Sequence, residues 1–176
     1  MKKIFVIIAA AVISALVSFE AKAQYSRTFE LGGGMTAYTV DDKVDPGYTV
    51  FGEMRFYTGP KFDLGFRIED NFAWNVVQDE ISDFRDNSFS ILGVMDYNFA
   101  YSGTFNPYVG VELGGSMMHN QNFDRGNTLC YTDLVVGPRI GFELAHHVRL
   151  AATYRYNFFH KRYSYYGFTL SWSFEI

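Results

Sequence analysis

Two histidines, His119 and His160, have neighbours that could support catalysis. An imidazole can act as a base toward a hydroxyl when a third group orients it, which is the arrangement used in nucleophilic acyl transfer. The candidates for nucleophile and orienting group are Ser116, Ser164, Asp124 and Glu112. A catalytic site must be argued from geometry, and spacing in the sequence does not supply it. We therefore favour the interpretation that both histidines are exposed at the edge of the fold without a catalytic role.

The remaining candidates for chemistry match no complete motif. Gly32-Gly33-Gly34 lacks the Gly-Lys-Ser/Thr continuation of a phosphate loop, so these glycines more simply make room for bulky neighbours in a strand. The acidic runs 41–45 and 79–86 carry oxygen ligands suited to Ca²⁺ but lack EF-hand spacing. We interpret them as solvated loops, with Ca²⁺ binding as an open alternative. Cys130 is the only cysteine, which excludes a disulfide within the chain. We expect no cofactor and no metal site.

The first residues have the pattern of a secretory signal peptide. Lys2 and Lys3 precede an apolar run over residues 4–17, and Ala21-Lys22-Ala23 offers the small residues that a signal peptidase accepts. The run has 14 residues, whereas a helix that spans hydrocarbon needs about 20. The sequence therefore predicts a signal peptide over residues 1–23 and an exported domain over residues 24–176.

Composition excludes one class of partner and favours strands. Removal of the signal peptide shifts the formal charge from −4 to −6, so nucleic acid is not expected as a partner. Hydrophobic residues make up 48% of the chain and aromatic residues 19%, yet beyond the signal peptide they occur in short runs. Apolar material divided in this way is typical of strands.

Eight windows alternate apolar and polar side chains, which is the period of a strand with two unlike faces. We expect tight turns near Gly59, Gly103 and His146. Longer polar loops are expected at the first, third and fifth joints, with the joint at residues 160–163 the short member of that set, an asymmetry typical of outer-membrane barrels. The windows are residues 28–37, 48–57, 62–69, 88–99, 108–117, 132–144, 148–158 and 167–176. The sequence thus predicts an all-β fold, an eight-stranded antiparallel up-and-down transmembrane β-barrel.

Charged residues in these windows fall on the polar face. An arginine on the lipid face near the bilayer midplane costs about 2–4 kcal/mol, whereas inside the barrel it can pair with a carboxylate. Eight strands enclose an interior that side chains can fill, so we expect a salt-bridged plug and no open channel. The predicted network consists of Glu30, Glu53, Arg55, Arg67, Glu69, Glu112, Arg139, Glu143 and Arg155.

Some residues do not fit the alternation. Pro138 lies inside the sixth window, where it removes a ladder hydrogen bond, so we expect a bulge beside Gly137 or a break in the strand. Three apolar residues fall on the interior face, namely Phe51, Leu92 and Val94. Tyrosines and tryptophans near strand ends predict two aromatic girdles at the membrane interfaces. They are Tyr25, Tyr57, Tyr101, Tyr163, Tyr165 and Trp172.

The signal peptide, the strand pattern and the final segment over residues 165–174 resemble the small bacterial outer-membrane barrels, the group that contains the transmembrane domain of OmpA and the OmpX proteins. The resemblance covers residues 24–176 and implies insertion in the bacterial outer membrane. It also implies an assembly signal, read by the barrel assembly machinery, at Gly167, Leu170, Trp172 and Phe174. Members of this group usually end on an aromatic residue, whereas this chain continues with Glu175-Ile176.

Three function hypotheses follow. The first is a monomeric, non-enzymatic outer-membrane protein whose barrel carries surface loops that contact lipopolysaccharide, other cells or ligands. The second is an outer-membrane enzyme that modifies lipid A with His119 or His160 at the rim. The third is a soluble periplasmic β-barrel that binds a small ligand, which would need an apolar lumen and a polar exterior, the reverse of the predicted faces.

Overall fold

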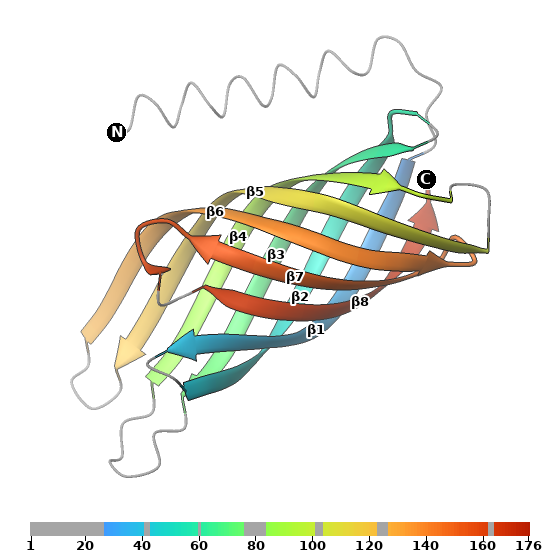
Figure 1. Ribbon diagram of the computed structural model, residues 1–176. Coiled ribbons are helices and arrows are strands. Elements are labelled where there is room, and N and C mark those ends of the chain that lie inside the picture. Colours follow the sequence, from blue (N-terminus) through green and yellow to red (C-terminus); the bar gives the residue numbers. More distant parts are fainter. Residues whose placement is uncertain are drawn as a thin grey trace, which may run out of the picture.

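The computed structural model describes residues 27–40, 43–59, 61–75, 84–100, 104–122, 127–161 and 164–176. The predicted signal peptide lies outside these residues. Eight strands follow one another round a closed antiparallel barrel, which confirms the predicted fold (Figure 1). They are β1 (Arg27–Val40), β2 (Lys43–Tyr57), β3 (Phe62–Asn75), β4 (Phe84–Asn98), β5 (Phe105–Asn122), β6 (Asn127–Leu144), β7 (Val148–Asn157) and β8 (Tyr165–Glu175). Among the described residues, no helix is long and apolar enough to cross a membrane.

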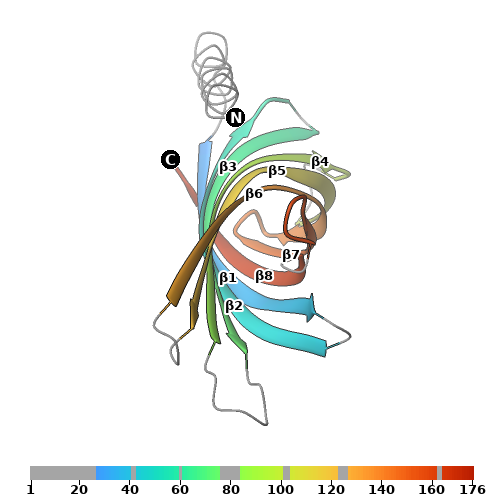
Figure 2. The ribbon, with the colours of Figure 1, turned by 90° about the vertical axis from the view of Figure 1, so that its left-hand side faces the viewer.

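The barrel closes where the first and last strands pair. The ladder between β1 and β8 runs from Thr28 opposite Glu175 to Tyr38 opposite Tyr165. Figure 2 shows β7, β8 and β1 following one another round this part of the wall. Closure leaves no free sheet edge at the level of the paired strands, and this is the condition for a sheet to lie in hydrocarbon.

The strands are longer than the alternating windows at one end of the barrel. β5 and β6 pair as far as Asn122 opposite Asn127, and β1 and β2 pair as far as Val40 opposite Lys43. The long loops predicted at these two joints are therefore wrong, because most of their residues are strand. The period-2 pattern ends earlier than the strands because both faces of a sheet can be polar where it leaves the apolar layer.

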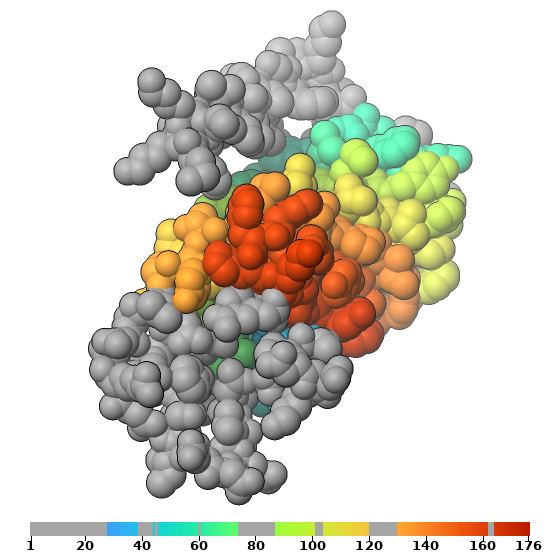
Figure 3. Space-filling model, turned by 60° about the vertical axis from the view of Figure 1, so that its left-hand side comes forward, coloured from blue at the N-terminus to red at the C-terminus, as the bar shows by residue number. Residues whose placement is uncertain are grey.

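Side-chain burial alternates along the strands in the predicted phase. In β8, Phe168 and Leu170 are 66% and 53% exposed, whereas the intervening Thr169 is buried. Figure 3 shows the outer face of the molecule over the orange and red strands. The outer face of the barrel is apolar and the inner face is polar, which is the reverse of a soluble barrel. In water, an exposed apolar surface costs roughly 25 cal/mol per Å².

Aromatic side chains gather outside the barrel at both ends of the strands. At the end with the β2–β3 turn, the ring of Tyr97 lies 5.2 Å from the rings of both Phe62 and Phe99. At the opposite end, Tyr154 lies 4.8 Å from Tyr166. The prediction of Tyr165 in a girdle is wrong, because this ring points into the lumen and is 4% exposed. The alternation of β8 gives the outward position to Tyr166 instead. Tyr25, Tyr101 and Tyr163 lie outside the described residues.

Pro138 neither breaks β6 nor forms a bulge, so that expectation is wrong. β6 pairs with β5 through Pro138 without interruption. On the other side, its ladder with β7 omits Gly137 and Pro138 but resumes in the same register, from Val136 opposite Tyr156 to Arg139 opposite Thr153. The strand continues because Pro138 points outward and Gly137 lets the two backbones approach closely.

Gly137→Ala is expected to lower the free energy of unfolding by about 1–3 kcal/mol, the range for overpacking. An added Cβ would lie 2.1 Å from the carbonyl oxygen of Tyr154, a backbone atom that cannot move alone. The matched control is Gly93→Ala, where the nearest atom, the Leu113 carbonyl oxygen, lies 3.6 Å away. Urea unfolding of the barrel in vesicles, followed by its heat-dependent gel shift, measures both, and equal effects would contradict the prediction.

Candidate functional site

The alternation of the strands places one row of charged side chains after another inside the barrel. Each is at most 5% exposed. Because burying a charge is costly unless an oppositely charged group lies beside it, these side chains need partners inside the barrel. The arginines are Arg55, Arg67, Arg139, Arg149 and Arg155, and the carboxylates are Glu30, Glu53, Asp63, Glu69, Asp96, Glu112, Asp133 and Glu143. We call this set the lumen network.

Arg55 holds two pairs of like charges together. Glu30 lies directly opposite Glu53 across β1 and β2, and Asp63 lies opposite Asp96 across β3 and β4. Like charges in these positions repel. The Nε of Arg55 lies 2.8 Å from Glu53 and 3.3 Å from Glu30. Its Nη1 donates to Asp63 at 3.2 Å, and its Nη2 donates to Asp96. One guanidinium therefore bridges both repulsive pairs, and Arg139 and Arg149 supply further positive charge to them.

Arg139 connects walls that are not neighbours in the sheet. From β6, its Nη1 and Nη2 donate to the two oxygens of Glu53 on β2 at 3.0 and 3.1 Å. Its Nε and Nη2 donate to Asp96 on β4 at 2.7 and 2.5 Å. A third carboxylate, Glu112, lies 3.3 Å from Nη1. Charge-assisted pairs with two parallel bonds are the strong and geometrically specific class of ion pair.

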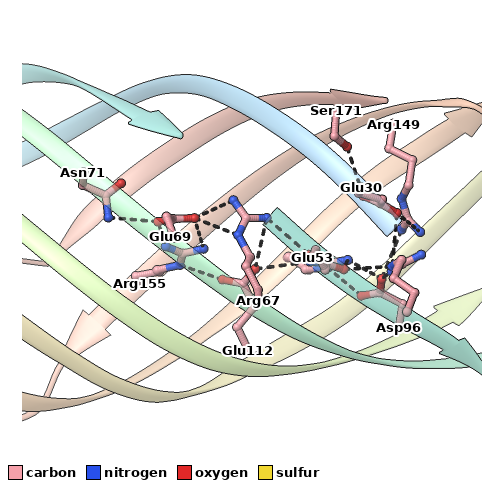
Figure 4. Close-up of polar contacts among 12 residues, drawn as sticks. Glu30, Glu53, Arg67, Glu69, Asn71, Asp96, Glu112, Arg149, Arg155 and Ser171 are labelled. Atoms are coloured by element: carbon pink, nitrogen blue, oxygen red, sulfur yellow. Dashed lines mark hydrogen bonds and ion pairs between the residues drawn. The ribbon is translucent and has the colours of Figure 1, made fainter. Parts of the chain in front are cut away.

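A second group of the network lies farther toward the loop end (Figure 4). Arg155 on β7 donates to Glu112 at 2.6 Å through Nε and to Glu69 on β3 at 2.9 Å through Nη2. Arg67 donates to Glu69 at 2.7 Å. The Tyr165 hydroxyl donates to Glu69 at 2.9 Å and accepts a bond from Arg155. This group is linked to the Arg55 group because Arg67 also lies 3.5 Å from Glu53.

Arg149 was not part of the predicted network, yet the structure places it there. It lies 3.1 Å from Asp96 and 3.5 Å from both Glu30 and Glu143. Its guanidinium also stacks on Tyr108, 3.9 Å from the ring centroid. Asp63 and Asp96 were likewise left out of the predicted network. The alternation had placed all three on the polar face, and this position is the signal that assigns them to the lumen.

Apolar residues inside the lumen have a packing role. The ring of Phe51 lies 3.4 Å below the guanidinium of Arg67, a cation–π contact. An added Cβ at Gly32 would lie 2.5 Å from this ring, so glycine makes the room that the sequence interpretation expected. Leu92 and Val94 are buried on the same inner face.

A small cavity lies at the loop end of the lumen. Its volume is about 10 Å³, room for about one water molecule. Its lining includes Tyr38, Ser90, Ser116 and Tyr165. The cavity reaches Tyr165, whose hydroxyl belongs to the Glu69–Arg155 group, so the network lies directly beneath it.

The rim histidines have separate surroundings. His160 lies 3.3 Å from the carboxylate of Asp133, which also accepts the backbone N–H groups of Phe159 and His160 at 2.9 and 2.8 Å. His119 is exposed. The other predicted partners are engaged elsewhere: Ser164 accepts from the Asn157 backbone, Ser116 accepts from Ser90, and Glu112 accepts from Arg155 and Arg139. Asp124 lies outside the described residues.

Comparison with known proteins identifies the family. The model of the outer membrane protein β-barrel domain matches residues 8–175. The chain belongs to this family. It is a protein of the bacterial outer membrane, and its apolar exterior therefore faces lipid. Among curated proteins, no sequence matches the chain significantly.

Several solved structures share the fold of this chain, although their sequences are only distantly similar to it. Neisserial surface protein A is 17% identical with a TM-score of 0.63, over 85% of this chain and 97% of that one. Ail, the attachment invasion locus protein of Yersinia pestis, is 11% identical with a TM-score of 0.55, over 87% and 99%. The outer membrane enzyme PagL is 13% identical with a TM-score of 0.50, over 85% and 99%. At these identities the likeness concerns the fold alone.

The predicted assembly signal of this outer-membrane barrel lies on the closing strand. In β8, Leu170, Trp172 and Phe174 point outward and are about half exposed, whereas Gly167 points inward. The backbone of Ser173 donates to the carbonyl of His147 at 2.6 Å, and the His147 ring stacks on Trp172 with 5.6 Å between centroids. The last strand is thus tied to the β6–β7 turn as well as to β1.

Proposed function

We propose that this outer-membrane protein is a non-enzymatic anchor whose lumen is closed by the lumen network. The observation that carries the proposal is that arginines join opposite walls. Arg139 on β6 binds Glu53 on β2, and Arg155 on β7 binds Glu69 on β3. In a ring of eight strands, each of these pairs is separated by four positions, so the side chains cross the lumen. An eight-stranded barrel has no space beside such bridges for a solute path.

Conductance in planar lipid bilayers tests the closed lumen. The folded wild-type chain is expected to insert without stepwise conductance, while a general porin in the same bilayer serves as the positive control. Inserted protein is counted separately by its heat-dependent gel shift. Stable channel steps from the wild-type chain would contradict a closed lumen.

The rigid barrel supports a surface role at its loop end. The β5–β6 hairpin extends beyond the last β6–β7 pair, Val135 opposite Asn157, by the length of residues 127–134. In this proposal the monomeric barrel, inserted by the assembly machinery, holds its loops among lipopolysaccharide, where they contact this lipid, other cells or ligands. Binding of a fluorescent bacterial surface extract to cells with and without the protein tests the contact role, and equal binding would remove it.

One observation favours a second candidate function, the modification of lipid A. Asp133 is buried and lies beside His160 at the outer rim, which is how a carboxylate orients a catalytic imidazole. If the barrel acts on lipid A, a His160→Ala strain has a lipid A mass profile that differs from its parent and matches a deletion strain. Identical profiles in the deletion strain and the parent exclude this function.

A further inference from the structure

Asp70 is a charged residue on the lipid-facing wall. Its neighbours Glu69 and Asn71 point into the lumen, so the alternation of β3 turns Asp70 outward with Ile68 and Phe72. Asp70 is the only charged side chain on the outward face in the part of the strands whose side chains the structure describes, since the exposed Glu175 at the end of β8 has the parity of the inner face. An ionisable residue in a membrane wall is a candidate functional contact by default.

The position of Asp70 along β3 places it at the outer edge of the apolar layer. Phe62, in the girdle at the turn end, lies eight residues earlier on the same strand. A tilted strand rises about 20 Å over that length, close to the roughly 25 Å height of the apolar band. Asp70 therefore lies at the level where lipid headgroups begin, on the side of the outer leaflet.

The carboxylate of Asp70 has no side-chain partner among the described residues, and its hydrogen bond comes from the backbone of Asn71. Around it lie apolar and aromatic side chains of the neighbouring strands. Val50 and Phe89 are its cross-strand neighbours, and Tyr48 lies opposite Phe72. Tyr48 is 58% exposed, so its ring is available to a molecule outside the barrel.

We propose that Asp70, Tyr48 and Phe89 form a contact site for the sugar headgroup of lipopolysaccharide. The carboxylate accepts hydrogen bonds from sugar hydroxyl and amide N–H groups, and an exposed ring packs against the apolar face of a sugar. A second copy of the chain fits less well, since the described lipid-facing wall offers no basic side chain to pair with Asp70. This inference rests on the proposed function, in which the barrel lies among lipopolysaccharide, and it specifies which part of the barrel wall contacts that lipid.

The test compares stability with and without lipopolysaccharide. The full mature chain is folded into phosphatidylcholine vesicles that lack or contain lipopolysaccharide, and its urea midpoint is read from the heat-dependent gel shift. Lipopolysaccharide is expected to raise the wild-type midpoint, and Asp70→Leu is expected to lose more than half of that rise. Glu175→Leu, which removes a charge at the opposite end of the barrel, is expected to retain the full rise.

Each arm has an outcome that overturns the site. Equal rises in Asp70→Leu and wild type exclude it. In phosphatidylcholine alone, Asp70→Leu should be at least as stable as wild type, and a loss of stability there would show a structural role instead. Asp70→Asn keeps an acceptor oxygen and should retain part of the rise. If EDTA abolishes the wild-type rise, a divalent cation bridges Asp70 to a phosphate, and the sugar contact is wrong. Because bilayer conductance does not depend on Asp70, failure here leaves the closed lumen untouched.

Discussion

Arg55→Met is expected to remove a large part of the stability of the folded barrel. Breaking one buried ion pair by removing one partner costs about 3–5 kcal/mol, against roughly 5–15 kcal/mol for the total stability of a folded domain. Arg55 contacts four carboxylates in two repulsive pairs, so its loss leaves these pairs with Arg139 and Arg149 as their counter-charges and Asp63 without a paired arginine among the described residues. The measurement is the urea midpoint in vesicles and the fraction of chain that shows the gel shift of the folded barrel.

A second substitution shows whether the loss in Arg55→Met comes from the missing ion pairs or from repulsion between the remaining carboxylates. Asp63→Asn in the Arg55→Met background removes one of the two like-charge pairs and is expected to restore part of the stability. Arg55→Lys keeps the charge but lacks the planar fork, so it should fall between wild type and Arg55→Met. A midpoint unchanged in Arg55→Met, or unaffected by Asp63→Asn, would mean that this guanidinium does not hold the carboxylates together.

The alternation of the sequence was enough to predict which residues enter the lumen but not which of them meet. Glu53 and Arg139 share the polar face of their strands, and this follows from the period alone. Their contact across the barrel depends on the register and the tilt of strands that never pair with each other, and no local pattern encodes these. Asp96 was left out of the predicted network for the same reason: it is the only charge in the window 88–99, yet it meets Arg55, Arg139 and Arg149 in space.

The failed expectations each have a physical cause. A proline inside a strand predicted a defect at Pro138, but the neighbouring Gly137 allows close approach of the strands and the register is kept. Tyr165 was assigned to a girdle by residue type, although its place in the alternation is inward. The strand ends at Asn122 and Asn127 were missed because residues 119–122 are all polar in sequence, so the alternation stops there although the backbone pairing continues.

Val111→Arg is expected to destabilise the barrel by about 2–4 kcal/mol, the cost of an arginine on the lipid face near the bilayer midplane. Val111 is 47% exposed on the outward face of β5 and lies six residues above Phe105, which is about half the height of the apolar band. The urea midpoint in phosphatidylcholine vesicles measures the loss. Val111→Leu, which keeps an apolar side chain at the same place, should leave the midpoint within the error of the method.

The depth dependence of this cost distinguishes a lipid-facing wall from an ordinary apolar surface. Phe105→Arg replaces an exposed residue at the girdle of the turn end, where an arginine costs about 0–1 kcal/mol because its guanidinium reaches the headgroups. If the exterior of this barrel faced water or another protein, the two arginines would not differ by their height along β5. A large loss at Val111 together with a small loss at Phe105 therefore requires a hydrocarbon layer around the strand, whereas equal losses would contradict the membrane position of the barrel.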